Sequence, residues 1–184
     1  MQSLKAVIGM AATLALTTPV LAQEVNVYSS RHYDSDNALY EEFTDKTGIS
    51  VNRIEADADE LIARLTDEGA NSPADVFITV DVGRMARAEE AGVLQPFTSD
   101  VIKTRVPAHL RHPDDLWFGL SQRTRIIFYA KDRVETPPQT YEELADPKWQ
   151  GKVCIRSSSN VYNQSLLATI IDADGEDAAK TWAA

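Results

Sequence analysis

The sequence predicts an α/β fold built on a mainly parallel sheet, and three observations lead to this class. Apolar runs typical of strands occur around Val25, over 49–54 and over 75–80. Amphipathic stretches of helical length separate these runs, and glycines close two of the helices at Gly48 and Gly69. Strands that alternate with helices form βαβ units, in which consecutive strands are parallel.

The first strand ends in a polar loop, which is the strongest local sign of a binding site. Val25 and Val27 alternate with polar neighbours, and the run stops at two serines. A cation, an imidazole and a phenol follow on consecutive residues, namely Arg31, His32 and Tyr33. Ligands of open α/β sheets bind at the carboxyl ends of strands, so this loop is a candidate site.

The elements up to residue 91 follow from capping residues and apolar periodicity. Residues 34–36 offer N-caps for a helix over about 37–47, whose expected apolar face is Leu39, Tyr40 and Phe43. Asp57 caps a helix with Leu61, Ile62 and Leu65 on its apolar face. The continuous apolar run over 75–80 predicts a strand covered on both faces, and Asp81 then caps a helix over about 82–91.

The second half of the sequence has a weaker pattern. Residues 117–131 predict an extended connection, which Arg123 and Arg125 interrupt. A short helix is expected to start near 141–144, and a buried strand over 153–155 is expected to carry Cys154 as an inert thiol. A serine run then precedes a helix over about 161–171, with Tyr162 in its first turn. A final amphipathic stretch, 176–184, has no cap and no closing strand, so we expect the fold to be unfinished at its end.

Residues 1–22 predict a secretory signal peptide. Lys5 is their only charge, the apolar core is too short to span a bilayer, and small residues at −3 and −1 predict cleavage after Ala22. The remaining chain has 17 Lys and Arg against 28 Asp and Glu, a net charge of −11. This acidity argues against nucleic acid and anionic membranes as partners. The single cysteine excludes an intrachain disulfide.

Several stretches together resemble one known family. They are residues 28–33 (YSSRHY), 75–84 (DVFITVDVGR), 92–96 (GVLQP), 119–125 (GLSQRTR), 146–152 (DPKWQGK) and 157–165 (SSSNVYNQS). In this order they are similar to periplasmic ferric-ion-binding proteins of ABC iron transporters, in the branch with a His-Tyr pair on the first loop. The resemblance implies a periplasmic-binding-protein-like (type II) fold, in which two α/β lobes close on Fe(III). It places a near-complete first lobe at 23–122, and a hinge strand and the incomplete start of the second lobe at 123–184.

The resemblance also implies the ligands and partners of the site. The iron ligands would be His32, Tyr33 and Tyr162, and the family's later Tyr-Tyr pair has no counterpart in this sequence. Fe(III) favours anionic oxygen donors, and imidazole nitrogen is also suitable. A synergistic anion such as carbonate or citrate would be bound by Arg31, Arg123, Arg125 or Ser158. The implied role is that of a monomeric periplasmic receptor that captures Fe(III) and delivers it to an inner-membrane ABC permease.

Other interpretations of the same residues stay open. The fold could serve another small anion or an organic cation, or the chain could be a truncated, non-functional fragment. A hydrolase would pair His32 with Ser29, Ser30 or Ser158, but the sequence has no nucleophile-elbow pattern and no identifiable third group. From the pattern alone, the three arginines are also typical of surface or interlobe ion pairs, and Asp81 of a plain helix cap.

Overall fold

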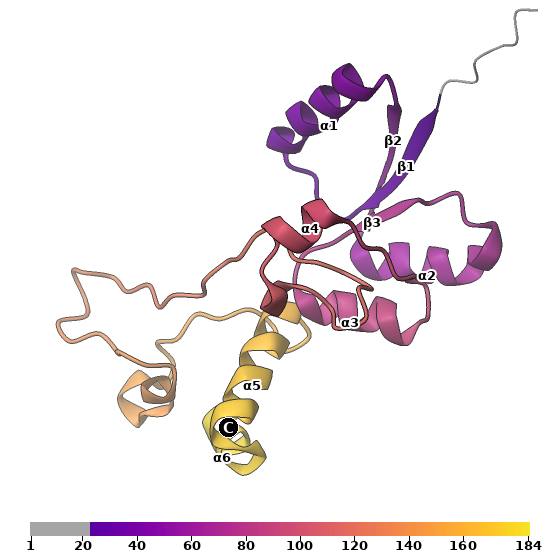
Figure 1. The fold of residues 1–184 in the computed structure, drawn as a ribbon. Helices are drawn as coiled ribbons and strands as arrows, with labels where there is room; N and C mark the ends of the chain where they lie inside the picture. The colour runs from indigo at the N-terminus through magenta and orange to yellow at the C-terminus, as the bar shows by residue number, and fades with distance from the viewer. Residues whose placement is uncertain (1–22) are drawn as a thin grey trace, which may run out of the picture.

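A three-stranded parallel sheet is the centre of the fold (Figure 1). The structure, a computed structural model, describes residues 23–184, so the predicted signal peptide lies outside the described residues. The strands are β1 (Glu24–Ser29), β2 (Ser50–Glu55) and β3 (Val76–Ile78), in the order β2-β1-β3. This confirms the predicted α/β class and the parallel sheet.

The central position of β1 sets the arrangement of the helices. Helix α1 (Asp34–Thr47) connects β1 to β2, and α2 (Ala58–Glu68) with the short 3-10 helix η1 (Gly69–Asn71) leads from β2 to β3. Because β2 and β3 lie on opposite sides of β1, the direction of the chain crossover reverses, and α1 and α2 lie on opposite faces of the sheet (Figure 1). The point at which the chain changes its direction across the sheet therefore lies between β1 and β3, at the carboxyl ends of these strands.

The core of this sheet lies between β1 and α2. Tyr28 is completely buried and packs with Leu61 and Leu65 of α2. Partly buried apolar residues surround them, among which are Ile54, Ala74, Phe77 and Val93. The apolar periodicity of α2 had predicted this face. The predicted strand over 75–80 is shorter than expected, since β3 covers three residues and Val76 is 42% exposed instead of covered on both faces.

The capping predictions are confirmed at two helices and wrong at one. Asp57 accepts a hydrogen bond from the Asp59 N–H, and Asp81 accepts one from the Gly83 N–H at the start of α3 (Val82–Glu90). Helix α1 begins earlier than predicted, at Asp34, and none of residues 34–36 caps it, because its N-cap is Tyr33.

The apolar face predicted for α1 is also wrong. Leu39 is 64% exposed and Phe43 39% exposed. The residue that α1 buries is Asp36, whose carboxylate forms an ion pair instead of a cap.

After α3, the chain forms short helices and a long connection without strands. Helix α4 (Asp100–Arg105), capped by the Ser99 hydroxyl, was not predicted. Short 3-10 helices follow, namely η2 (Ala108–Leu110), η3 (Glu142–Ala145) and η4 (Pro147–Trp149). Residues 117–131 form the predicted extended connection, but the implied hinge strand over 122–129 has no strand partner among the described residues.

The predicted buried strand over 153–155 is wrong. These residues are not a strand, Val153 and Ile155 are 43% and 55% exposed, and Cys154 is exposed as well. A strand requires a hydrogen-bonded neighbour, and residues 23–184 supply none at this position.

Two helices complete the described chain and form a second, smaller core. Helix α5 (Val161–Asp174) and α6 (Glu176–Ala183) pack through Leu166, Ile170 and Ala179. The Trp182 indole donates to the Tyr141 carbonyl at 2.6 Å, which connects α6 to the segment before η3. Both helices match the predicted ranges closely, and the first turn of α5 lies beside α3 (Figure 1).

Candidate functional site

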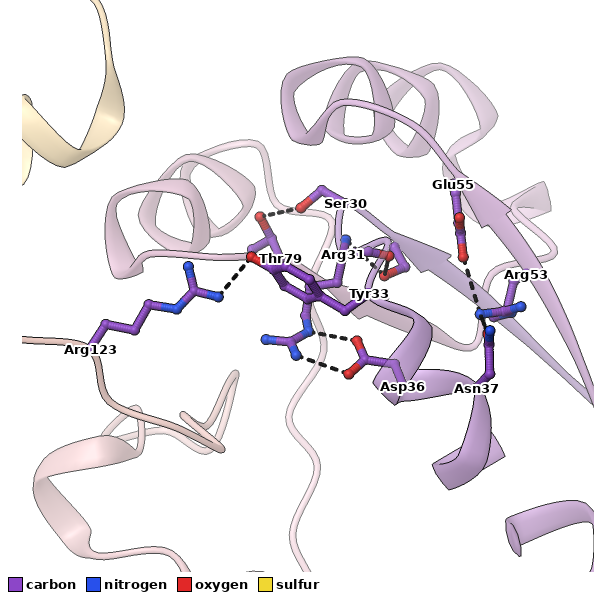
Figure 2. Close-up of polar contacts among 10 residues, drawn as sticks. Ser30, Arg31, Tyr33, Asp36, Asn37, Arg53, Glu55, Thr79 and Arg123 are labelled. Carbon is purple, nitrogen blue, oxygen red and sulfur yellow. Dashed lines mark hydrogen bonds and ion pairs between the residues drawn. The ribbon is translucent and has the colours of Figure 1, made fainter. Parts of the chain in front are cut away.

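The candidate site begins where β1 and β3 end side by side. Ser29 is paired with Ile78, and the Ser30 N–H donates to the Ile78 carbonyl at 2.9 Å. The Ser30 hydroxyl donates to Thr79 Oγ1 at 3.0 Å (Figure 2). The chain changes its direction across the sheet between β1 and β3, so the loops after these adjacent strands leave the same end of the sheet in opposite directions. The space between two such loops is the usual ligand site of an open α/β sheet.

The loop after β1 is held by its own polar side chains. The buried Ser29 hydroxyl accepts from the Arg31 N–H and donates to the Arg31 carbonyl, both at 3.0 Å. The Arg31 guanidinium forms two hydrogen bonds with the Asp36 carboxylate, at 3.0 and 3.1 Å (Figure 2). These bonds lower the pKa of Asp36 and raise that of Arg31. The loop is therefore fixed between the strand and α1.

His32 and Tyr33 are presented on the outside of this loop. Their rings stack with centroids 5.8 Å apart, and Tyr33 is 43% exposed. The Arg31 guanidinium lies 5.0 Å from the centre of the Tyr33 ring. Arg123, 90 residues later, donates from Nη2 to the Tyr33 hydroxyl at 3.0 Å (Figure 2).

Tyr162 lies in the first turn of α5, after the Asn160 N-cap. Its backbone N–H donates to Asn160 Oδ1 at 3.0 Å. Two guanidinium groups lie over its ring, that of Arg125 at 5.2 Å and that of Arg156 at 5.4 Å from the ring centre. Arg125 in turn donates to Asp81 Oδ2 at 2.7 Å.

Arg123 binds Tyr33 directly. The pKa of Arg123 is raised, mainly by its hydrogen bond to the Tyr33 hydroxyl. Each of the three arginines predicted to bind an anion thus lies beside one of the two tyrosines. Arg31 and Arg123 lie at Tyr33. Arg125 lies at Tyr162. Sequence reasoning missed Arg156, which directly precedes the serine run, and gave Asp81 only a capping role.

Ser158 lies apart from these contacts. It is exposed in the loop before α5, and its carbonyl accepts from Gln164 Nε2 at 3.4 Å.

An open pocket of about 460 Å³ lies next to the start of α5. Its lining is rich in guanidinium and hydroxyl groups and consists of Asp59, Arg84, Arg87, Arg156, Ser157, Ser159, Asn160 and Val161. Arg84 Nε is buried there without a hydrogen-bond partner among the described residues. The pocket is suited to an anion, and it is distinct from the surroundings of Tyr33.

The side chains that most often bind metals do not cluster in the described part of the chain. Within residues 23–184, no group of three or more His, Cys, Asp or Glu side chains could hold a metal ion. Among the described residues, no helix is both long and apolar enough to cross a bilayer.

Comparison with known proteins gives consistent matches. Residues 71–184 match the family model of bacterial extracellular solute-binding proteins. The chain is 58% identical to iron uptake protein A1 of Synechocystis, over 90% of this chain and 46% of that protein. It is 31% identical to the major ferric iron-binding protein of Neisseria meningitidis, over 94% of this chain and 53% of that protein.

A solved structure agrees with these sequence matches. The Trichodesmium protein IdiA, also called FutA, in complex with iron and citrate, superposes with a TM-score of 0.82 and 56% identity, over 87% of this chain and 51% of that chain. The chain thus spans about half the length of the curated relatives it matches.

Proposed function

This chain belongs to the bacterial extracellular solute-binding proteins, and we propose that it captures Fe(III) in the periplasm for import by an ABC permease. The type II α/β fold expected from the resemblance is confirmed by the solved ferric-binding relatives, over about half of their length. The members of this family to which the chain is similar are binding proteins and not enzymes. We further propose that residues 1–22 are removed on export and that the receptor acts as a monomer. Its first lobe would be 23–122, and 123–184 would be the hinge strand and the incomplete start of the second lobe.

One observation carries the proposal, namely that one extended segment supplies an arginine to each of two tyrosines that lie 129 positions apart in the sequence. Arg123 donates to the Tyr33 hydroxyl, and Arg125 lies over the Tyr162 ring. Fe(III) is a hard ion that favours anionic oxygen, so it displaces the phenol proton when it binds. Arg123 donates to the Tyr33 hydroxyl at 3.0 Å, so a cation already lies beside this proposed ligand oxygen. His32, stacked on Tyr33, supplies the nitrogen donor of the proposed set.

Charge balance supports a bound anion beside the iron. Two phenolates and one neutral imidazole leave one of the three positive charges of Fe(III) unbalanced, and coordination positions remain free. Arg31 and Arg125 already bind carboxylates of the chain, whereas Arg123 binds the Tyr33 hydroxyl. We therefore propose Arg123 as the main contact of carbonate or citrate, with Arg31, Arg125 and Ser158 contributing less.

A ferric citrate titration tests this function. The chain is expressed with residues 1–22, purified from the periplasm and titrated while a visible phenolate-to-iron absorption band is recorded. We expect a band in the wild type that Tyr33→Phe and Tyr162→Phe each weaken strongly. Tyr129→Phe is the matched control, because it removes one hydroxyl from another exposed tyrosine and should leave the band unchanged. A folded wild type without a band would reject the proposed function.

A second candidate function is the binding of a small anion without iron, which the arginine-lined pocket favours. Arg84, Arg87 and Arg156 line one cavity together with hydroxyl groups. Calorimetric titration with citrate alone separates the two functions. Binding that Arg84→Gln weakens and Tyr33→Phe does not would favour an anion receptor.

A further inference from the structure

Asp81 has a backbone conformation that is unusual for a residue with a side chain. Its φ of 72° and ψ of 135° lie outside the favoured regions, and Asp115 is the other non-glycine residue with positive φ in residues 23–184. The Asp81 side chain is 7% exposed. Strained residues of this kind are held by their surroundings and concentrate at functional sites.

The Asp81 carboxylate contacts three separate parts of the chain. Oδ1 accepts from the Gly83 N–H at 3.0 Å and from the Ser165 hydroxyl at 2.6 Å. Oδ2 accepts from Arg125 Nη2 at 2.7 Å. A helix cap requires only the first of these bonds. The other two connect the end of β3 to α5 and to the long connection between them.

The first turns of α3 and α5 touch at this point (Figure 1). A Cβ atom on Gly83 would lie 3.2 Å from the Val161 side chain and 3.3 Å from Asp81 Oδ1, so glycine allows this close approach. Arg87 adds a second connection, because its Nη2 donates to Gln164 Oε1 at 2.9 Å. Asp81 is therefore enclosed between two helices that belong to the two proposed lobes.

Arg125 extends this contact to Tyr162. Its guanidinium is bound to Asp81 on one side and lies 5.2 Å from the centre of the Tyr162 ring on the other. A guanidinium fixed by a carboxylate has few rotamers left, so the Tyr162 ring is confined by Arg125 and Arg156.

We propose that Asp81 is a positioning residue for metal binding. It orients Tyr162 through Arg125 and through the α3–α5 contact; this inference rests on the proposed function. A carboxylate in the first lobe thereby sets the geometry of an iron ligand in the second. Partners that orient a metal ligand typically change metal affinity by about 10- to 100-fold when they are removed.

The test compares Asp81→Asn, Arg125→Gln and the double variant in the full chain prepared as above. In Asp81→Asn, the side-chain oxygen can still accept hydrogen bonds from Gly83 and Ser165. The new NH2 group is a donor and cannot accept the hydrogen bond from Arg125, so this variant removes mainly the contact with Arg125. Asp67→Asn is the matched control, because it removes the same charge from an exposed position on α2. Readouts are the affinity for Fe(III), added as ferric citrate, and the position and intensity of the phenolate-to-iron band.

We expect Asp81→Asn and Arg125→Gln each to weaken Fe(III) binding about 10- to 100-fold and to alter the band, while Asp67→Asn changes neither. The double variant should be no worse than the worse single variant, since both interrupt one chain of contacts. Additive losses, or an Asp81→Asn variant with lower thermal stability but unchanged affinity and band, would overturn the inference. If Tyr162→Phe abolishes the band and Asp81→Asn does not alter it, this inference fails while the proposed function stands. No band in the folded wild type rejects both.

Discussion

Replacing Asp36 by asparagine tests whether the ion pair of Arg31 with Asp36 stabilises the loop after β1, which carries His32 and Tyr33. The Asp36 side chain is 13% exposed, and its carboxylate accepts two hydrogen bonds from the guanidinium. Hydrogen bonds to charged groups contribute about 1.5–3 kcal/mol, and breaking a fully buried pair costs about 3–5 kcal/mol. Because the Arg31 side chain is still 26% exposed, the lower range applies. We expect Asp36→Asn to lower the free energy of unfolding by about 2 kcal/mol at pH 7.

The sign of the pH dependence follows from the lowered pKa of Asp36, which Arg31 causes through its hydrogen bonds. In the unfolded chain, aspartate has a pKa of about 3.9. The stabilisation by Asp36 is therefore fully present above that value and is lost as the pH falls through the lower pKa of the folded state. The difference between wild type and Asp36→Asn should be constant from pH 7 to about 5 and should shrink below about pH 4.

Urea unfolding followed by circular dichroism measures this difference. With a slope of about 2 kcal/mol per molar, the midpoint should move by about 1 M at pH 7. Asp34→Asn is the control, since Asp34 lies in the same first turn of α1 and is exposed. It should cost only the helix-dipole contribution of about 0.3–1 kcal/mol. Equal losses in the two variants, or an Asp36→Asn deficit that is as large at pH 3 as at pH 7, would refute the reasoning.

Two further predictions concern the core under the sheet. Leu61 is 1% exposed, so Leu61→Ala should lower the free energy of unfolding by about 3 kcal/mol in the same urea assay. A loss below about 1 kcal/mol would contradict this, because it would mean that neighbouring side chains fill the cavity. Tyr28→Phe removes a hydroxyl that lies 3.0 Å from both Glu68 oxygens and should cost about 1 kcal/mol, because Glu68 keeps its bonds to Arg64 and Ser72. A Tyr28→Phe loss as large as that of Leu61→Ala would show that this hydroxyl is needed for packing.

Much of the fold could be predicted because its signals are local. The alternation of Val25 and Val27 and the period of Leu61 and Leu65 give the strand and the buried helix face directly. Asp57 and Asp81 cap their helices through bonds that span two residues. Such contacts depend only on neighbouring residues, which is why they could be predicted, although the same reasoning failed at the N-cap of α1.

The failures occur where an element depends on a distant partner. Val153, Cys154 and Ile155 have the composition of a buried strand, yet they are exposed, because strand formation needs a neighbour that residues 23–184 do not offer. The apolar residues Leu39 and Phe43 of α1 were also predicted to be buried, yet they are exposed, and the residue that this helix buries is Asp36, paired with Arg31.

The candidate site shows the same division between local and distant signals. His32, Tyr33 and Tyr162 were identified from the polar loop and the family resemblance. The bond of Arg123 to Tyr33 spans 90 residues and that of Ser165 to Asp81 spans 84, and no local pattern encodes either. The one usable signal for Asp81 was its position directly after a strand, at the edge where the first loop also begins.

The charges around the two tyrosines favour binding of the proposed metal together with the proposed anion. The chain carries a net charge of −10, yet four arginines surround the two tyrosines. Arg31 and Arg125 are neutralised by Asp36 and Asp81, whereas Arg123 and Arg156 have no carboxylate partner within residues 23–184.

Their two charges add to the one that two phenolates and an imidazole leave on the proposed Fe(III). An anion beside this excess positive charge is electrostatically favoured, and because Arg123 and Arg156 are exposed, the effect should weaken as the salt concentration rises. On the proposed function, iron and a carboxylate or carbonate anion should therefore bind cooperatively, each raising the affinity for the other by the same factor.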